Sequence, residues 1–293
     1  MAAFGNRGAR MIWVKIIGIG LASVLLLWGS LALLGAWLWP QRMAEMQRRL
    51  AAAELNLPDA AYDPAQLDGL PAPVARYLHA VLTPGQPRIR RVEMAHEGLF
   101  NMGEGADNWK PFTSTQSVTV ARPGFVWDGR IAMAPGLPVR VIDAYVAGEG
   151  MLLPAILGLI PLTRLQGGGA IAEGELLRWL AETPWYPTAL LPGGAVSWAA
   201  IDDHSARAMV TDGAVQVELT FTFGPDDLIT TIRAEARSRT VAGAMIPTPW
   251  EGRWWGYERR NGFVVPTSGE VSWILPQGRK PYWQGRVTAL HAE

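Results

Sequence analysis

Hydrophobic and polar positions divide the chain into one uncharged apolar segment near the start and a long series of short alternating patterns after it. Residues 16–39 contain no charged side chain and are rich in Leu, Ile, Val, Gly and Trp. As a helix rising about 1.5 Å per residue, such a segment is longer than the ~30 Å hydrocarbon core of a bilayer. The pattern predicts a transmembrane helix over 16–39, preceded by a cytoplasmic tail over 1–15.

A cleaved signal peptide is the alternative for this segment, because a signal peptide has an apolar core of ~7–15 residues that ends at small residues. Here the apolar run is longer and ends in Trp37-Leu38-Trp39-Pro40, which favours an uncleaved anchor. Three basic residues precede the segment and three follow it, so the positive-inside rule gives no direction. Because the body is the more acidic part and the tail is short, we expect a single-pass inner (cytoplasmic) membrane protein with an extracytoplasmic body.

The next segment, residues 40–86, is predicted to contain a juxtamembrane helix, a proline-rich linker and a short helix. Four prolines between residues 56 and 73 interrupt any regular structure. The short helix follows, because apolar residues at positions 74, 77, 78 and 81 fall on one helical face.

Residues 87–293 show the period of two that is typical of half-buried strands. The clearest case runs from Val215 to Phe223, and a Gly-Pro-Asp-Asp turn leads from it to a second amphipathic strand. Asn261-Gly262 is the strongest short hairpin signal in the chain. About ten such strands without βαβ alternation predict a mainly antiparallel domain, a curved or half-barrel sheet that wraps a central helical insert over 150–192.

The insert begins with an apolar run, Met151 to Leu162, which has no charged or polar side chain. It is too short to span a bilayer and too apolar to lie free in water. We expect it to be a buried core helix in the concavity of the sheet. A place in the membrane interface, or over a ligand, is the alternative.

A second helix is predicted from Ile171 to Glu182. Its charged residues Glu175, Arg178 and Glu182 have the three- and four-residue spacing of an ordinary ion-pair ladder on a helix surface. The alternative is that Arg178 and Glu182 line a pocket beside Trp185, where a buried arginine would hold an anionic group.

Several motifs of this chain are similar to one known family. Arg178-Trp-Leu-Ala-Glu182 and Trp185-Tyr-Pro-Thr-Ala-Leu-Leu191 resemble the central signature of a bacterial, membrane-anchored family of unknown function. The similarity extends over most of residues 70–290, including Leu70-Pro-Ala-Pro-Val-Ala-Arg76 and Gly269-Glu270-Val-Ser-Trp273. It implies no activity. The predicted arrangement also resembles, more weakly and in architecture alone, the half-barrels of lipoprotein-carrier proteins, which hold acyl chains in their concave face.

Charge and composition exclude some function classes. The chain has 26 basic and 26 acidic residues, but residues 1–50 carry a net charge of +5, so the rest is acidic at −5. An acidic body without a basic patch argues against nucleic-acid binding. The chain has no cysteine, and no two of its four histidines have the spacing of metal ligands on a helix. We therefore expect no metal site and no cofactor, and protein partners stay unknown.

The sequence favours a membrane-tethered domain that binds a lipid or another apolar ligand between the curved sheet and the insert, and that is not an enzyme. The predicted ligand-binding residues combine aromatic rings with a charged pair: Arg178, Glu182, Trp185, Tyr186, Trp127 and Tyr145. One alternative is a cell-envelope hydrolase that uses the carboxylates of Glu182, Glu149 and Asp143. The other is a structural or interaction protein of the envelope.

Overall fold

The computed structural model describes residues 5–55, 60–241 and 243–293. Residues 1–4 of the predicted tail and residues 56–59 of the predicted linker lie outside the described residues. Four helical elements precede or interrupt the sheet, and two short 3-10 turns follow the last α-helix: α1 (Gly5–Ala53), η1 (Pro64–Leu67), α2 (Ala72–Val81), α3 (Ala170–Ala181), η2 (Thr183–Trp185) and η3 (Pro187–Leu190).

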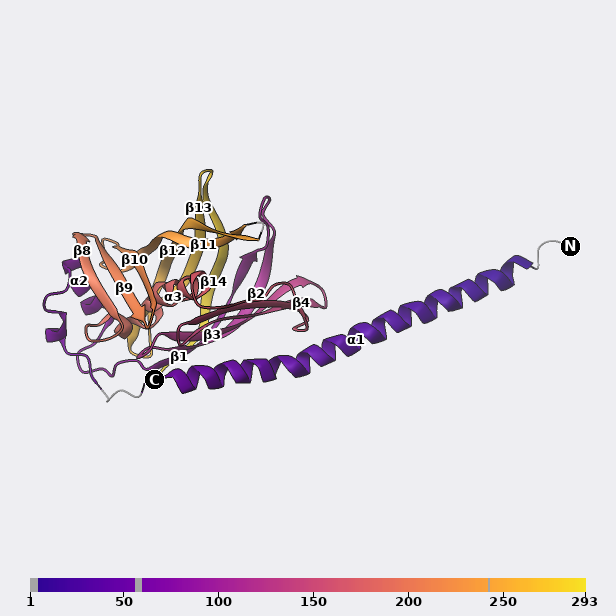
Figure 1. The fold of residues 1–293 in the computed structure, drawn as a ribbon, viewed down its shortest axis with the longest axis horizontal. Helices are drawn as coiled ribbons and strands as arrows, with labels where there is room; N and C mark the ends of the chain where they lie inside the picture. The colour runs from indigo at the N-terminus through magenta and orange to yellow at the C-terminus, as the bar shows by residue number, and fades with distance from the viewer. Residues whose placement is uncertain (1–4, 56–59, 242) are drawn as a thin grey trace.

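One antiparallel sheet contains all the strands of the described residues, and it curls into a half-barrel (Figure 1). Its strands are β1 (Arg91–Asn101), β2 (Trp109–Thr119), β3 (Gly124–Ala134), β4 (Leu137–Val146), β5 (Glu149–Ile156), β6 (Ile160–Pro161), β7 (Leu165–Gly167), β8 (Val196–Asp202), β9 (Ser205–Asp212), β10 (Val215–Phe223), β11 (Ile229–Val241), β12 (Ala244–Arg260), β13 (Phe263–Leu275) and β14 (Gly278–Ala292). The order is β6-β5-β4-β3-β2-β1-β14-β13-β12-β11-β10-β9-β8, with β7 beside β5.

Neighbouring strands are mostly consecutive in sequence, except where β1 pairs with β14 and joins the two halves of the sheet. The antiparallel half-barrel around a helical insert is confirmed, with fourteen strands rather than about ten. Asn261 and Gly262 both have positive φ angles, 48° and 84°, as a two-residue hairpin turn requires. This turn joins β12 to β13 as the sequence predicts.

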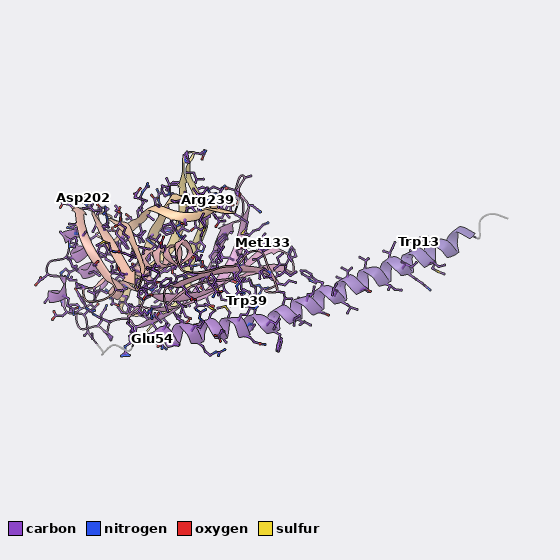
Figure 2. All side chains as sticks on the ribbon, viewed as in Figure 1. Trp13, Trp39, Glu54, Met133, Asp202 and Arg239 are labelled. Atoms are coloured by element: carbon purple, nitrogen blue, oxygen red, sulfur yellow. The ribbon has the colours of Figure 1, made fainter. Side chains whose placement is uncertain are left out.

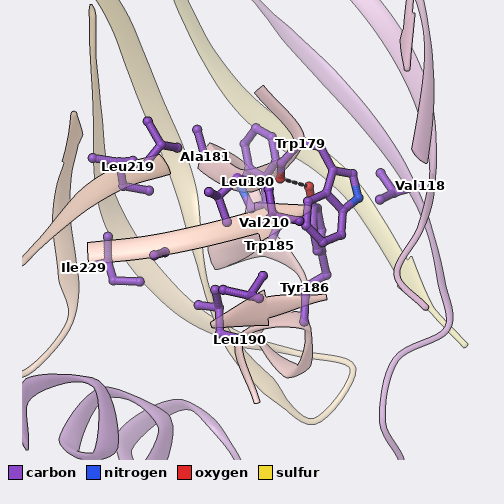
Figure 3. Close-up of a cluster of buried hydrophobic side chains, with 14 of the residues drawn as sticks. Val118, Trp179, Leu180, Ala181, Trp185, Tyr186, Leu190, Val210, Leu219 and Ile229 are labelled. Atoms are coloured by element: carbon purple, nitrogen blue, oxygen red, sulfur yellow. Dashed lines mark hydrogen bonds between the residues drawn. The ribbon is translucent and has the colours of Figure 1, made fainter. Parts of the chain in front are cut away.

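The concave face of the sheet holds α3, η2 and η3 (Figure 1). Their large side chains fill the hollow: Trp179, Trp185, Tyr186 and Leu190 are each at most 2% exposed. Figure 3 shows these residues together with strand residues such as Val210, Leu219 and Ile229. The ring nitrogen of Trp185 donates to the carbonyl oxygen of Pro266 on β13 at 3.0 Å. The helical insert is therefore the core of the half-barrel, since burial of such rings stabilises the fold strongly.

The opposite face of β3, β4 and β5 packs against the C-terminal part of α1. Along β4 the side chains alternate as a strand requires: Ile142 and Ala144 belong to the cluster under α1, whereas Val141 belongs to the core around α3. Trp39 of α1 is fully buried in this second cluster. Pro40 lies inside the helix, which continues without a break to Ala53.

The apolar run Met151–Leu162 does not form the expected core helix. It forms β5, a turn and the two-residue strand β6. β5 lies between two layers, because Met151 and Leu153 face α1 while α3 packs on its other face. Periodicity cannot distinguish a strand covered on both faces from a short buried helix, which explains the error.

Candidate functional site

The guanidinium of Arg178 on α3 is largely buried and makes three side-chain hydrogen bonds. Its Nη1 donates to Asp143 Oδ2 at 2.6 Å, its Nε to Glu182 Oε1 at 2.7 Å, and its Nη2 to Gln116 Oε1 at 3.1 Å. Gln116 also donates from Nε2 to Glu182 Oε2 at 2.5 Å. α3, β4 and β2 are thus joined through one cation, and all three of its donor nitrogens are occupied.

Aromatic rings and further charges enclose this network. The Arg178 Cζ lies 4.7 Å from the ring centroid of Phe125 and 5.3 Å from that of Trp127. Burial opposes the charge of Arg178, but the negative charges of Glu182, Asp143 and Glu175 outweigh it and raise the pKa of the guanidinium. Glu175 and Glu182 are only 4% and 8% exposed. The surface ladder expected from their spacing is therefore wrong, because the sheet wraps this helix on more sides than its periodicity shows.

Glu175 lies near a second arginine, Arg237, and near other negative charges. Arg237 Nη2 of β11 lies 4.0 Å from Glu175 Oε2. Burial and then the charge of Asp143 raise the pKa of the Glu175 carboxyl well above its ordinary value. Glu175 Oε2 and Asp143 Oδ1 are buried without a hydrogen-bond donor among the described residues. A proton on Glu175 would give one of these oxygens a donor.

His96 on β1 is buried near the same network. Its ring lies 4.9 Å from that of Trp185, and Ser114 Oγ lies 3.3 Å from its Nδ1. Burial and the charge of Arg178 lower its pKa to about 3. The imidazole is therefore neutral, and it packs as part of the core.

Of the six predicted ligand-binding residues, five gather at α3. Arg178 and Glu182 pair with each other, Trp127 lies under Arg178, and Trp185 and Tyr186 fill the hollow. The hydroxyl of Tyr186 donates to the carbonyl oxygen of Trp179 at 2.5 Å, drawn as a dashed line in Figure 3.

The sixth, Tyr145 on β4, points elsewhere. It is fully buried and donates through its hydroxyl to Asp212 Oδ2 at 3.0 Å. The four aromatic residues of this set belong to the hydrophobic core.

The three carboxylates of the hydrolase alternative do not converge. Asp143 and Glu182 both bind Arg178, whereas Glu149, at the start of β5, pairs with Arg49 of α1 at 2.8 Å. The side chain of Glu149 is half-exposed on the α1 side of the sheet. Within the described residues, no three His, Asp or Glu side chains lie close enough to hold a metal ion.

A cleft of about 1310 Å³ opens where the end of the insert meets one end of the sheet. Its walls come from the end of α1, the segment before β1, the β2–β3 turn, the residues after η3 and the end of β9. The apolar part of the surface comes mainly from Ala51, Leu55, Ile89, Val120, Pro123 and Ala189. Four arginines and three carboxylates complete it: Arg88, Arg90, Arg91, Arg122, Glu54, Asp212 and Glu293.

Two of the arginines in this cleft are paired with acids. Arg91 binds Glu54 at the end of α1. Arg122 binds Asp212 at 3.0 Å, and Tyr145 holds the other oxygen of that carboxylate. Tyr145, one of the predicted site residues, therefore holds a carboxylate that lines the cleft.

Arg88 is different. Its Nη2 donates to the carbonyl oxygen of Pro192 at 3.0 Å, and its Nε is buried without a hydrogen-bond partner. None of the described carboxylates forms an ion pair with it. Burial lowers the pKa of its guanidinium. The cleft thus contains a cation that is partly desolvated and has no acidic partner among residues 5–55, 60–241 and 243–293.

The family of the chain follows from a match over residues 68–291 to a model described as a family of unknown function, DUF6920. This match covers the half-barrel and the whole helical insert. The chain belongs to the DUF6920 family. The family prediction made from the signature Arg178 to Leu191 is confirmed. No curated protein matches the chain.

Three solved structures are similar to this chain at low sequence identity. A LolA superfamily protein from Nitrosomonas europaea is 12% identical, with a TM-score of 0.37, and the alignment covers 75% of this chain and 92% of that one. A DUF1329 family protein from Desulfovibrio piger is 8% identical, with a TM-score of 0.37 and coverage of 79% and 94%. A β-barrel-like DUF1849 protein from Brucella abortus is 7% identical, with a TM-score of 0.21 and coverage of 70% and 99%.

The cleft of the DUF6920 domain was missed by sequence reasoning. Arg88 belongs to a short stretch with three basic residues, Arg88, Arg90 and Arg91, directly before and at the start of β1. That cluster was the available signal. The cleft that this cluster lines also needs residues far away in sequence, such as Thr188 and Asp212, which only the fold brings beside it.

Proposed function

We propose that this DUF6920 protein is a membrane-tethered, extracytoplasmic domain that binds an amphiphile, with an apolar chain and an anionic head group, in the cleft beside Arg88. The observation that carries the proposal is a partly desolvated arginine that has no acidic partner in the described part of the chain and lies in a large, partly apolar cleft. Ligand sites typically combine an apolar lining with a few polar groups that fix orientation. Arginine suits a carboxylate or phosphate head group because it donates two parallel hydrogen bonds.

The tether rests on α1. Its described part contains a helix with a mean hydropathy of 2.2 over its most apolar window, long and apolar enough to cross a membrane; a signal sequence would satisfy the same criterion. An uncleaved anchor is supported by the contacts of Trp39, whose ring nitrogen donates to Asp128 Oδ1 at 2.9 Å. Arg42 Nη1 donates to the carbonyl oxygen of Gly158 at 2.8 Å. These contacts hold the helix directly against β3 and the β5–β6 turn.

Ligand binding is tested with dodecyl phosphate as the anionic amphiphile and dodecyl maltoside as its neutral counterpart. Their affinities are measured by displacement of a fluorescent fatty acid from the full chain in nanodiscs. Arg88→Ala is expected to weaken dodecyl phosphate binding about tenfold, the equivalent of one charge-assisted hydrogen bond. The neutral amphiphile is expected to lose far less.

Arg286→Ala is the matched control, because Arg286 is exposed, pairs with Glu97 and does not line the cleft. Equal affinity of wild type and Arg88→Ala for dodecyl phosphate would exclude the head-group role of Arg88. Absence of any displacement by either amphiphile would exclude the binding function itself.

The side of the membrane is tested by cysteine labelling, because the chain has no cysteine of its own. Ile201→Cys places a thiol at an exposed position of β8. In intact spheroplasts, a membrane-impermeant maleimide is expected to label this thiol without lysis. Labelling only after lysis would place the domain in the cytoplasm.

A further inference from the structure

The N-terminal part of α1 extends beyond the sheet, and we call it the free part of α1 (Figure 1). Two hairpin turns of the half-barrel lie beside it. Gly136, in the turn between β3 and β4, faces the indole of Trp28: a Cβ at this glycine would lie 3.8 Å from Trp28 Nε1. Gly35 of α1 touches the turn after β5, where a Cβ would overlap the carbonyl oxygen of Leu157. The absence of a side chain at Gly35 therefore permits the close contact between helix and turn.

Both turns lack charged residues over their full length. Residues 131–139 of the β3–β4 hairpin and residues 151–163 around the β5–β6 turn contain no Asp, Glu, Lys or Arg. Ile160 and Leu162 are 55% and 54% exposed, and Ala134 and Pro135 are also exposed. By contrast, the β8–β9 turn contains Asp202 and Asp203.

The uncharged β3–β4 turn and the charged β8–β9 turn lie at opposite ends of the sheet. Figure 2 shows Met133 at the end of the sheet from which the free part of α1 extends, and Asp202 at the far end. Two exposed arginines, Arg130 and Arg164, flank the uncharged turns in sequence, whereas Arg140 is half-buried and paired with Asp128. Exposed cations at the edge of an apolar surface match the interfacial region of a bilayer.

The contacts also set the depth of the two turns relative to the anchor. They touch α1 at Trp28 and Gly35, in the second half of the uncharged segment 16–39. A span of ~20 helical residues suffices for the hydrocarbon core, so a helix that enters the bilayer at residue 16 leaves it at about residue 35. The β5–β6 turn, beside Gly35, therefore meets the bilayer at the level where α1 emerges from it, and the β3–β4 turn, beside Trp28, lies deeper within the span.

We infer that the β3–β4 and β5–β6 turns insert into the lipid bilayer beside α1 and form a second, monotopic contact of the domain with the membrane. This inference rests on the tether proposed above. The bilayer is the favoured occupant because the apolar surface of the turns is continuous with the apolar surface of the helix. α1 and the two turns together fix the domain in one orientation, because the helix is docked on β3 to β5 as far as Ala53.

The test uses single-cysteine variants of the full chain, reconstituted into vesicles of phosphatidylcholine and phosphatidylglycerol and labelled with a nitroxide. Ile160→Cys and Leu162→Cys report on the turn. Val24→Cys, which is exposed on the free part of α1, reports on the anchor, and Ile201→Cys serves as the aqueous control. Power saturation compares collisions with oxygen, which concentrates in the bilayer, and with a water-soluble nickel chelate.

Positions 24, 160 and 162 are expected to favour oxygen over the nickel chelate at least several-fold more than position 201 does. Nickel accessibility at 160 and 162 equal to that at 201, with 24 in lipid, would overturn the inference and leave the anchor intact. Protection of 160 and 162 from both reagents would indicate a protein contact instead, and would also overturn it. Nickel accessibility at 24 would overturn the proposed anchor together with this inference.

Discussion

Arg178 and Arg88 lie in the same half-barrel in opposite environments. Arg178 donates to Asp143, Glu182 and Gln116 and lies over two aromatic rings. Arg88 donates only to a carbonyl oxygen and lines an open cleft. Arg178 belongs to the family signature, and Arg88 does not belong to any motif recognised in the sequence. The comparison teaches that a signature residue can be one on which the fold depends, while the residue proposed to bind a ligand lies elsewhere.

The largest expected difference between the two arginines is in stability. Arg178→Ala leaves buried carboxylates without their cation and is expected to lower the free energy of unfolding by about 3–5 kcal/mol. Arg88→Ala breaks no ion pair with the residues that the structure describes and is expected to cost less than about 1 kcal/mol. Urea unfolding of both full-length variants in detergent, followed by tryptophan fluorescence, measures the two changes. Equal midpoints for the two variants would remove the distinction.

A smaller effect on stability is expected from the buried histidine beside the network, and it appears at acidic pH. The pKa of His96 is about 3 in the folded protein, below the ordinary value of 6.5. Between these values the unfolded chain binds a proton that the folded chain does not, so stability falls as pH decreases from 6.5 toward 3. The slope approaches ~1.4 kcal/mol per pH unit. His96→Gln should flatten this part of the profile, and an unchanged slope would show that His96 does not cause it.

The smallest change in the free energy of unfolding is expected for Glu175→Gln. The pKa of Glu175 is raised in the folded state, so the folded chain retains a proton that the unfolded chain releases above pH 4.5. Wild-type stability therefore falls as pH rises from 4.5 to the folded pKa. The neutral amide should cost less than about 1 kcal/mol at pH 4.5 and should gain stability relative to wild type at higher pH. Parallel stability profiles for the two proteins would contradict a protonated Glu175.

Local sequence patterns predicted much of the fold. The alternation from Val215 to Phe223, the Asn261-Gly262 turn and the helix around Arg178 all appear at the expected places. These features depend on neighbours close in sequence. Met151–Leu162 was assigned to a helix because a strand covered by α1 on one face and α3 on the other has no alternating pattern.

The site was less predictable than the fold. The burial of Glu175 and Glu182 depends on strands that lie far away in sequence, so their spacing alone suggested an exposed ladder. The cleft depends on the meeting of Arg88, Thr188 and Asp212, which no local pattern encodes. Local patterns therefore predict the helix at the centre of the domain but not the cleft beside it.

Photo-crosslinking tests most directly whether an amphiphile binds at Arg88 rather than at Arg178. A fatty acid with a diazirine in its chain is bound to the full-length protein in nanodiscs, irradiated, and located by peptide mass spectrometry. The account predicts adducts in residues 87–91, 120–123, 188–189 and 193–195, which line the cleft, and loss of these adducts in Arg88→Ala. Adducts on Trp127 or on residues 178–186 instead would contradict it.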